Sequence, residues 1–125
     1  MVEVKIYTGH SSSIDFRNKL YKPLKGSSIA EKHKLILPHD SDEFFNSKSF
    51  LQNDCDLFVA EVSRASTGLG IELGWADEYS IPVAYVHQEG ADPSPALEVI
   101  TDRIHSYGSK DELVEIVREV VEAEN

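Results

Sequence analysis

The chain has 125 residues, 41% hydrophobic and 27% charged, which is the composition of one globular domain over residues 1–125 and excludes a disordered chain. A formal net charge of −10 with scattered Lys and Arg residues argues against a nucleic-acid polymer as partner, because such a surface repels phosphate backbones. With one cysteine, no long apolar run and no leader-like N-terminus, the sequence predicts a cytoplasmic protein without an internal disulfide or a membrane partner.

The first half of the chain alternates between strand-like and helix-like patterns. Residues 2–8 alternate in polarity and predict a strand, and a polar bend at 9–13 leads into a helix-like segment at 14–26. Residues 34–38 predict a second short strand, which ends at a proline. Residues 41–52 predict a helix that is capped by its first or second residue.

The second half continues this alternation. Residues 56–62 are almost wholly apolar, as expected for a central parallel strand that is buried on both faces. The tail after Ser109 carries apolar side chains at helical spacing behind a serine cap, and acidic residues in its first turn, so it predicts a helix. The other predicted elements are a helix at 68–79, a strand at 82–86, a short helix at 95–101 and an edge strand at 103–107.

Five predicted strands alternate with five predicted helices. This pattern predicts an α/β fold, a doubly wound parallel sheet with helices on both faces. For the strand order 2-1-3-4-5, a ligand binds beyond the carboxyl ends of the first and third strands, where the order reverses. The loops at 9–13 and 63–70 follow these two strands, and their glycines and hydroxyls allow backbone N–H groups to approach an anion or a sugar.

The stretch SRASTGLGIELGWA at residues 63–76 places Glu72 just behind a Gly-x-Gly bend. In the first turn or two of a helix, the positive end of the helix dipole favours an ionised carboxylate. Such a carboxylate suits attack on the anomeric carbon of a sugar, or stabilisation of an oxocarbenium-like transition state. The alternative is a solvated acid that only complements the dipole. The bend alone is weak evidence, because it lacks the third glycine of a dinucleotide fingerprint and the lysine of a Walker A loop.

Four segments together carry a family resemblance: DLFVAEVSRASTGLGIELG at 56–74, Trp-Ala at 75–76, Ile-Pro-Val at 81–83 and Ile-Tyr-Thr-Gly at 6–9. They resemble the nucleoside 2-deoxyribosyltransferase family, including its 2′-deoxynucleoside 5′-phosphate N-hydrolase branch. The resemblance implies a flavodoxin-like fold and a homodimer or an assembly of dimers. It also implies cleavage or transfer at the N-glycosidic bond of a nucleoside or its 5′-monophosphate, without a cofactor.

The resemblance also assigns roles to single residues. Glu72 matches the family's nucleophile, and Ser66 matches the serine that holds the 5′ end of the substrate. The remaining residues of the implied substrate site are Tyr7 and Gly9 beside the base and sugar, His10 and Ser11 in the first loop, Gly68 and Gly70 in the backbone around the 5′ end, and Ser94 from a neighbouring subunit. The monophosphate hydrolases hold phosphate with a serine and an arginine in the first loop, whereas this loop reads His-Ser-Ser-Ser, with Arg17 further along.

The sequence departs from the family at its second acid. The usual aspartate lies eight residues before the Asp that opens the third strand, and counting back from Asp56 gives Lys48. A protonated lysine does not replace a carboxylate, although it would grip a phosphate or neutralise Glu72. Asp40 and Asp42 are alternative catalytic acids near the correct sheet end. The function is therefore either glycosidic cleavage or nucleotide binding by a catalytically impaired or sensor protein, and a flavodoxin-like domain for a flavin or phosphorylated effector is a third option. The histidines are not spaced as metal ligands are, so the sequence predicts no metal site.

Overall fold

The computed structural model describes residues 2–124 and contains a five-stranded parallel sheet in the order β2-β1-β3-β4-β5. The strands are β1 (Lys5–His10), β2 (Lys34–Ile36), β3 (Leu57–Glu61), β4 (Val83–Gln88) and β5 (Ile104–Tyr107). This order and the parallel pairing confirm the predicted doubly wound α/β fold. The order reverses between β1 and β3, so a ligand site is expected beyond their carboxyl ends.

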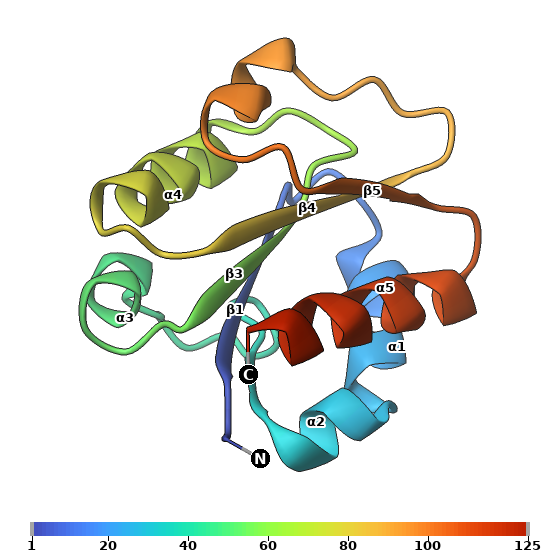
Figure 1. Ribbon diagram of the computed structural model, residues 1–125, viewed down its shortest axis with the longest axis horizontal. Coiled ribbons are helices and arrows are strands. Elements are labelled where there is room, and N and C mark those ends of the chain that lie inside the picture. The colour runs from blue at the N-terminus through green and yellow to red at the C-terminus, as the bar shows by residue number, and fades with distance from the viewer. Residues whose placement is uncertain (1, 125) are drawn as a thin grey trace.

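Helical segments connect the strands and cover both faces of the sheet. They are η1 (Arg17–Tyr21), α1 (Lys22–Lys25), α2 (Ser28–Lys32), α3 (Ser47–Asn53), α4 (Thr67–Glu78), η2 (Pro95–Val99) and α5 (Lys110–Ala123). Figure 1 shows α1, α2 and α5 on one face and α3 and α4 on the other. Among these, η1 is a single π-helical turn and η2 is a 3₁₀ helix.

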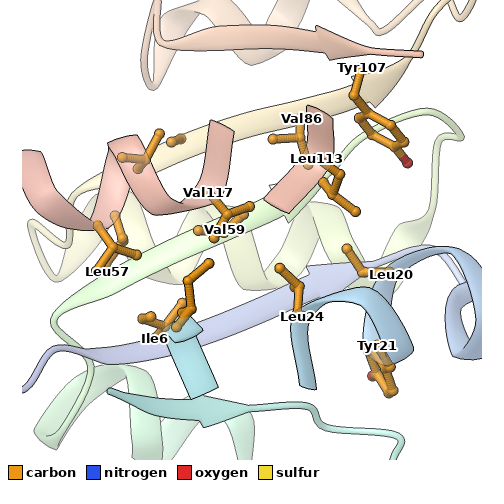
Figure 2. Close-up of a cluster of buried hydrophobic side chains, with 14 of the residues drawn as sticks. Ile6, Leu20, Tyr21, Leu24, Leu57, Val59, Val86, Tyr107, Leu113 and Val117 are labelled. Atoms are coloured by element: carbon orange, nitrogen blue, oxygen red, sulfur yellow. The ribbon is translucent and has the colours of Figure 1, made fainter. Parts of the chain in front are cut away.

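Alternating side chains of the strands form two hydrophobic cores. Ile6, Leu57 and Val59 point toward α1 and α5, where they meet Leu24 and Val117 (Figure 2). The residue that follows each of these three in its strand points the other way, toward α3 and α4. A sheet buried on both faces explains why apolar side chains in the central strands face both ways rather than alternating with polar ones.

The first strand lies further along the chain than predicted. It covers Lys5–His10, so Gly9 and His10 are its last two residues and not part of a loop. Both are buried, and they pair in register with Ala60 and Glu61 of β3. The polar first loop therefore begins at Ser11, and the expectation of a bend over 9–13 is wrong for its first two residues.

Two helix predictions also need correction. The segment at 14–26 is not one regular helix: the N–H of Lys22 reaches back to the carbonyl of Arg17 in a π-type turn, and Pro23, which has no N–H to donate, lies in the first turn of α1. The helix predicted at 41–52 begins only at Ser47. Its cap is Asn46, whose side chain accepts the N–H of Ser49 at 3.1 Å. Ser41, one of the expected caps, instead accepts the N–H of Glu43 at 3.3 Å in a local turn.

Apart from α2 (Ser28–Lys32), which the sequence analysis did not predict, the remaining elements agree with the sequence patterns within one or two residues. Ser109 caps α5 by accepting the N–H of Glu112 at 3.1 Å, and the predicted apolar stripe of α5 is buried or partly buried against the sheet. Burial raises the pKa of the Cys55 thiol to about 11, so the thiol stays protonated at neutral pH. None of the helices within residues 2–124 is long and apolar enough to cross a membrane.

Candidate active site

Glu72 lies on the second turn of α4, with its carboxyl turned toward the sheet. Leu69, Leu73 and Ala76 form the buried face of this helix, which leaves Glu72 on the flank of that face, against β1 and α3. The hydroxyl of Tyr7 donates a hydrogen bond to Oε2 of Glu72. Glu72 is only partly exposed, so the alternative of a freely solvated acid is wrong.

The hydroxyl of Ser47, the first residue of α3, completes this group. Its Oγ lies 2.7 Å from the Tyr7 hydroxyl. The single hydrogen of Tyr7 is given to Glu72, so the Tyr7 oxygen accepts from Ser47. Side chains from β1, α3 and α4 thus meet at one carboxylate.

Burial raises the pKa of Glu72 above its ordinary value, and this is the largest influence on it. The hydroxyls of Tyr7 and Ser47 and the charge of His39 act in the opposite direction but do not outweigh burial. The helix dipole, expected to favour the ionised form, acts mainly within the first turn of a helix, whereas Glu72 lies on the second turn, and burial acts in the opposite direction. Burial and the Glu72 charge also raise the pKa of Tyr7, which keeps its hydroxyl protonated as a donor.

Aromatic packing fixes the Tyr7 ring. Tyr7 is fully buried, and its ring is stacked on Phe45 with centroids 6.1 Å apart. Phe58 meets the same ring edge-on at 5.0 Å, and Phe50 lies at 6.1 Å. A hydroxyl carried by such a confined ring has few positions available, so it presents the hydrogen bond to Glu72 in a preorganised geometry.

His10 is part of the interior and not of an open site. It is 6% exposed, and its ring is stacked on Phe16 at 4.4 Å. Its Nδ1 lies 3.0 Å from the carbonyl of Ser11, and its Nε2 lies 2.6 Å from the hydroxyl of Tyr21, which itself accepts the N–H of His39 at 3.0 Å. This pattern fits a neutral ring with its proton on Nδ1, in agreement with burial lowering the His10 pKa. Ser11 is also buried.

His39 and Ser47 are the residues near Glu72 that the sequence did not point to. His39 is exposed, its ring centroid is 5.4 Å from that of His10, and its charge lowers the pKa of Glu72. The only sequence signal for His39 is its position next to Pro38, where the second predicted strand ends. For Ser47 the signal is its place one residue before the counted position, Lys48.

The structure does not bring the two sequence-predicted acid–base residues to Glu72. Asp40 pairs with Lys25 at 2.8 Å, and both side chains are about half exposed. The amine of Lys48 lies over the ring of Trp75, 5.7 Å from its centroid. Neither makes a hydrogen bond to Glu72 among the described residues, and Asp42 is exposed on the loop before α3.

A cavity of about 360 Å³ lies beside the start of α4, and we call it the α4 cavity. Three predicted substrate-binding residues line it, Ser66, Gly70 and Ser94. Ser66 caps α4 through the N–H of Leu69 at 3.3 Å. A Cβ on Gly70 would meet no atom within 4 Å, so intramolecular packing does not require this glycine, and the space beside it is open to a ligand.

The two other predicted glycines differ from each other. A Cβ on Gly68 would meet only the hydroxyl of Ser66 at 3.9 Å, so Gly68 also faces open space. A Cβ on Gly9 would lie 2.6 Å from the Phe58 ring, so Gly9 is required by packing in the sheet. Gly9 therefore does not line open space in this structure.

Glu72 and the α4 cavity lie on different flanks of the same helix. Gly70 and Glu72 are two residues apart, which is about 200° around a helix axis. A ligand that reaches both must therefore lie across the first turn of α4, where Gly68 leaves room. No cluster of three or more His, Cys, Asp or Glu side chains suited to a metal occurs within residues 2–124.

Comparison with known proteins finds a distant relative among curated sequences. The chain is 34% identical over 71 residues to the "Putative 2'-deoxynucleoside 5'-phosphate N-hydrolase 1" of Syntrophotalea carbinolica, a match that covers 54% of the chain and 50% of that protein. The chain thus spans about half the length of this curated relative. No family model matches the chain.

Two solved structures share the fold. A conserved protein from Enterococcus faecalis V583 superposes with a TM-score of 0.66 at 15% identity, over 95% of this chain and 99% of that one. The CMP N-glycosidase BcmB of Clostridium botulinum gives 0.60, also at 15% identity, over 91% of this chain and 98% of that one. The findings confirm the resemblance as distant homology to 2′-deoxynucleoside 5′-phosphate N-hydrolase, with the fold of a nucleoside deoxyribosyltransferase-like protein.

Proposed function

We propose that the chain cleaves the N-glycosidic bond of a nucleoside 5′-monophosphate, with Glu72 as the nucleophile. The observation that carries this proposal is the hydrogen bond from Tyr7 to one oxygen of Glu72, which orients the carboxylate and leaves the other oxygen for attack. The distant homology to a protein named as a nucleotide N-hydrolase, and the fold shared with a CMP N-glycosidase, support it.

The reaction follows from the chemistry of a positioned carboxylate. The free oxygen of Glu72 attacks C1′ of the sugar, the C1′–N bond breaks, and its electron pair leaves with the base. Water then attacks C1′ of the glycosyl ester, releases the sugar phosphate and regenerates Glu72. If a second base takes the place of water, the same intermediate gives transfer instead of hydrolysis.

The departing base needs a proton, so the mechanism requires a proton donor. Asp40 is paired with Lys25, and Lys48 lies over Trp75, so neither is presented to the site in this structure. His39 is the titratable side chain whose charge acts on Glu72, and an imidazole suits proton transfer near neutral pH. We assign it this role within the proposal, with solvent as its proton source.

The proposal includes a homodimer or an assembly of dimers. Ile71 on α4 is 50% exposed, and the glycines beside it at 70 and 74 have no intramolecular contact at the Cβ position. Small residues on a helix surface permit close approach of a second copy of the chain. Ser94 lines the cavity of its own chain here, and its predicted contribution from a neighbour remains part of this proposal. Light scattering at several protein concentrations tests the oligomeric state.

The deciding experiment is release of free base from nucleosides and their 5′-monophosphates, followed by chromatography with and without an acceptor base. Glu72→Gln keeps the size of the side chain and an acceptor for Tyr7 but removes the nucleophile, so base release should stop while ligand binding persists. Asp77→Asn is the matched control, because Asp77 is an exposed acid on the same helix. Equal rates in wild type and Glu72→Gln would remove Glu72 from the chemistry.

A nucleotide-binding protein without turnover is the second candidate. The placement of Asp40 and Lys48 away from Glu72 favours it, because loss of a general acid typically costs about 10²–10⁴-fold in rate. Tight binding of a monophosphate with no base release by the wild-type protein would support this candidate over the enzyme.

A further inference from the structure

Arg64, in the loop between β3 and α4, is an unpaired cation at the edge of the α4 cavity. It is exposed, it lines the cavity together with Ser66 and Ser94, and it makes no ion pair in the part of the chain that the structure describes, residues 2–124. Asp92 is the acidic side chain that lines the same cavity. In a chain with a net charge of −10, a free arginine beside a hydroxyl-lined cavity is a local reversal of charge.

The residue before Arg64 is held by a buried carboxylate. Glu61, at the end of β3, is 1% exposed. It accepts the backbone N–H of Ser63 at 2.6 Å and the Ser63 hydroxyl at 2.9 Å, and it also accepts the hydroxyl of Tyr107 from β5. The Ser63 oxygen in turn accepts the N–H of Gln88 at 2.8 Å. We call these four residues the Glu61 clamp; it ties the start of the loop to β4 and β5.

The loop is therefore fixed on both sides of Arg64. Ser63 is held by the Glu61 clamp, and Ser66 is held as the cap of α4 through Leu69. Only Arg64 and Ala65 lie between these two points. A side chain that leaves so short and so restrained a segment has a limited set of directions, which lowers the entropy lost when it binds a ligand.

The other arginine near the predicted site is already engaged. Arg17 lies over the ring of Phe16, 4.8 Å from its centroid, and its guanidinium is 3.5 Å from the carbonyl of His39. The first loop, expected to hold a phosphate, is also internally bonded, because Ser11 and Ser13 share a hydrogen bond at 2.8 Å. Arg64, by contrast, has no ion-pair partner among the described residues, so it is free to bind an anion.

We propose that Arg64, presented by the Glu61 clamp, is the specificity-determining residue that selects ligands with a 5′-phosphate. Its guanidinium binds the phosphate in the α4 cavity together with the Ser66 hydroxyl, and backbone N–H groups of the first turn of α4 complete the anion site. This rests on the proposed function for the identity of the ligand. It adds which side chain distinguishes a nucleotide from a nucleoside.

The test compares Arg64→Gln and Arg64→Lys with the wild-type protein. Arg118→Gln is the matched control, since Arg118 is an exposed arginine that pairs with Glu115 on α5. Affinities for CMP, cytidine, deoxycytidine monophosphate and deoxycytidine are measured by calorimetry, and base release is measured on the same four compounds. Inorganic phosphate serves as a competitor that needs no turnover.

The expected result is a loss of about tenfold or more in affinity for both monophosphates in Arg64→Gln, with little change for the two nucleosides. Arg64→Lys should recover part of the loss, because a lysine keeps the charge without the planar fork. Asp92→Asn should tighten monophosphate binding, since it removes the opposing charge. Glu61→Gln should act in the same direction as Arg64→Gln but more weakly, and should leave nucleoside affinity unchanged.

Two outcomes separate this proposal from the proposed function. The first outcome is that the wild-type protein releases no base, while Arg64→Gln loses the wild-type preference for monophosphates over nucleosides. This outcome would contradict the glycosidase and support the role of Arg64. A wild-type protein that releases base from monophosphates equally well with Arg64→Gln and with Arg118→Gln would overturn the role of Arg64 and leave the glycosidase standing.

Discussion

Replacing Tyr7 by phenylalanine should weaken both activity and stability through a single oxygen atom. The change keeps the ring that packs on Phe45, Phe50 and Phe58, and it removes the hydroxyl that donates to Glu72 and accepts from Ser47. A hydrogen bond to a charged group contributes about 1.5–3 kcal/mol, and a neutral one about 1 kcal/mol. We expect the free energy of unfolding to fall by about 2 kcal/mol at neutral pH.

The pH dependence gives this prediction its sign. The nucleophile must be ionised, so the rate falls as the pH drops through the pKa of Glu72. The Tyr7 hydrogen bond lowers that pKa, so Tyr7→Phe should raise it and move the acid limb of the rate profile to higher pH. A raised carboxyl pKa means that folding favours the protonated form, and the stability lost by the variant should grow as the pH rises through this pKa.

The assay is base release from a nucleoside monophosphate over a pH series that runs from acidic to slightly alkaline conditions, so that the whole acid limb is recorded. Urea unfolding at several pH values follows stability without requiring turnover. Tyr85→Phe is the matched control, because Tyr85 is also buried and its hydroxyl donates to the carbonyl of Leu97 at 2.7 Å, away from Glu72. An acid limb in the same place for wild type, Tyr7→Phe and Tyr85→Phe would refute the reasoning.

Three further predictions follow from single contacts. Gly9→Ala should lower the free energy of unfolding by about 1–3 kcal/mol in a denaturant titration, because its Cβ would overlap the Phe58 ring, and an unchanged midpoint would contradict this packing. His39→Gln should slow base release most for the bases that are hardest to protonate and should shift the acid limb to higher pH, because the His39 charge lowers the pKa of Glu72; a uniform slowing would leave His39 without a role in proton transfer. Asn46→Ala should cost about 1 kcal/mol of stability by calorimetry through loss of the α3 cap, whereas Ser41→Ala should cost little.

The fold was predictable because each strand carries its own signal. The alternation of strands with helices leaves few topologies, and the four consecutive apolar residues that open β3 mark a central parallel strand. The errors fall at element ends, where tertiary contacts decide. Strand β1 continues through Gly9 and His10 because Phe58 and Phe16 cover them, and neither contact is visible in the local sequence.

Of the candidate site, the sequence pointed only to the segment from Ser66 to Glu72 and to residues of the first strand and loop, and it missed Ser47 and His39. The family resemblance assigned a role to Ser66, whereas Glu72 was also singled out from its place behind the Gly-x-Gly bend; the structure places Ser66 at the N-cap of α4 and Glu72 on its second turn. Ser47 and His39 come from segments whose positions depend on how the loop after β2 folds back over β1. Counting along the chain led to Lys48. Helix α3 starts at Ser47, one residue before Lys48, and the hydroxyl of Ser47 contacts Tyr7 whereas the amine of Lys48 lies over Trp75.

Under the proposed function, the arrangement of the site on α4 favours a nucleotide over a smaller ligand. The carboxylate of Glu72 lies on one flank of the helix, and Ser66 lines the cavity on the other, so a free base or a free sugar would engage only one of them. The open Cβ positions of Gly68 and Gly70 let a ligand cross the helix start at close range, although each glycine costs about 0.5–1 kcal/mol relative to alanine in a helix. A helix that keeps two unpacked glycines at its start gives up stability for space. That loss is understandable when a ligand with two chemically different ends must span both flanks.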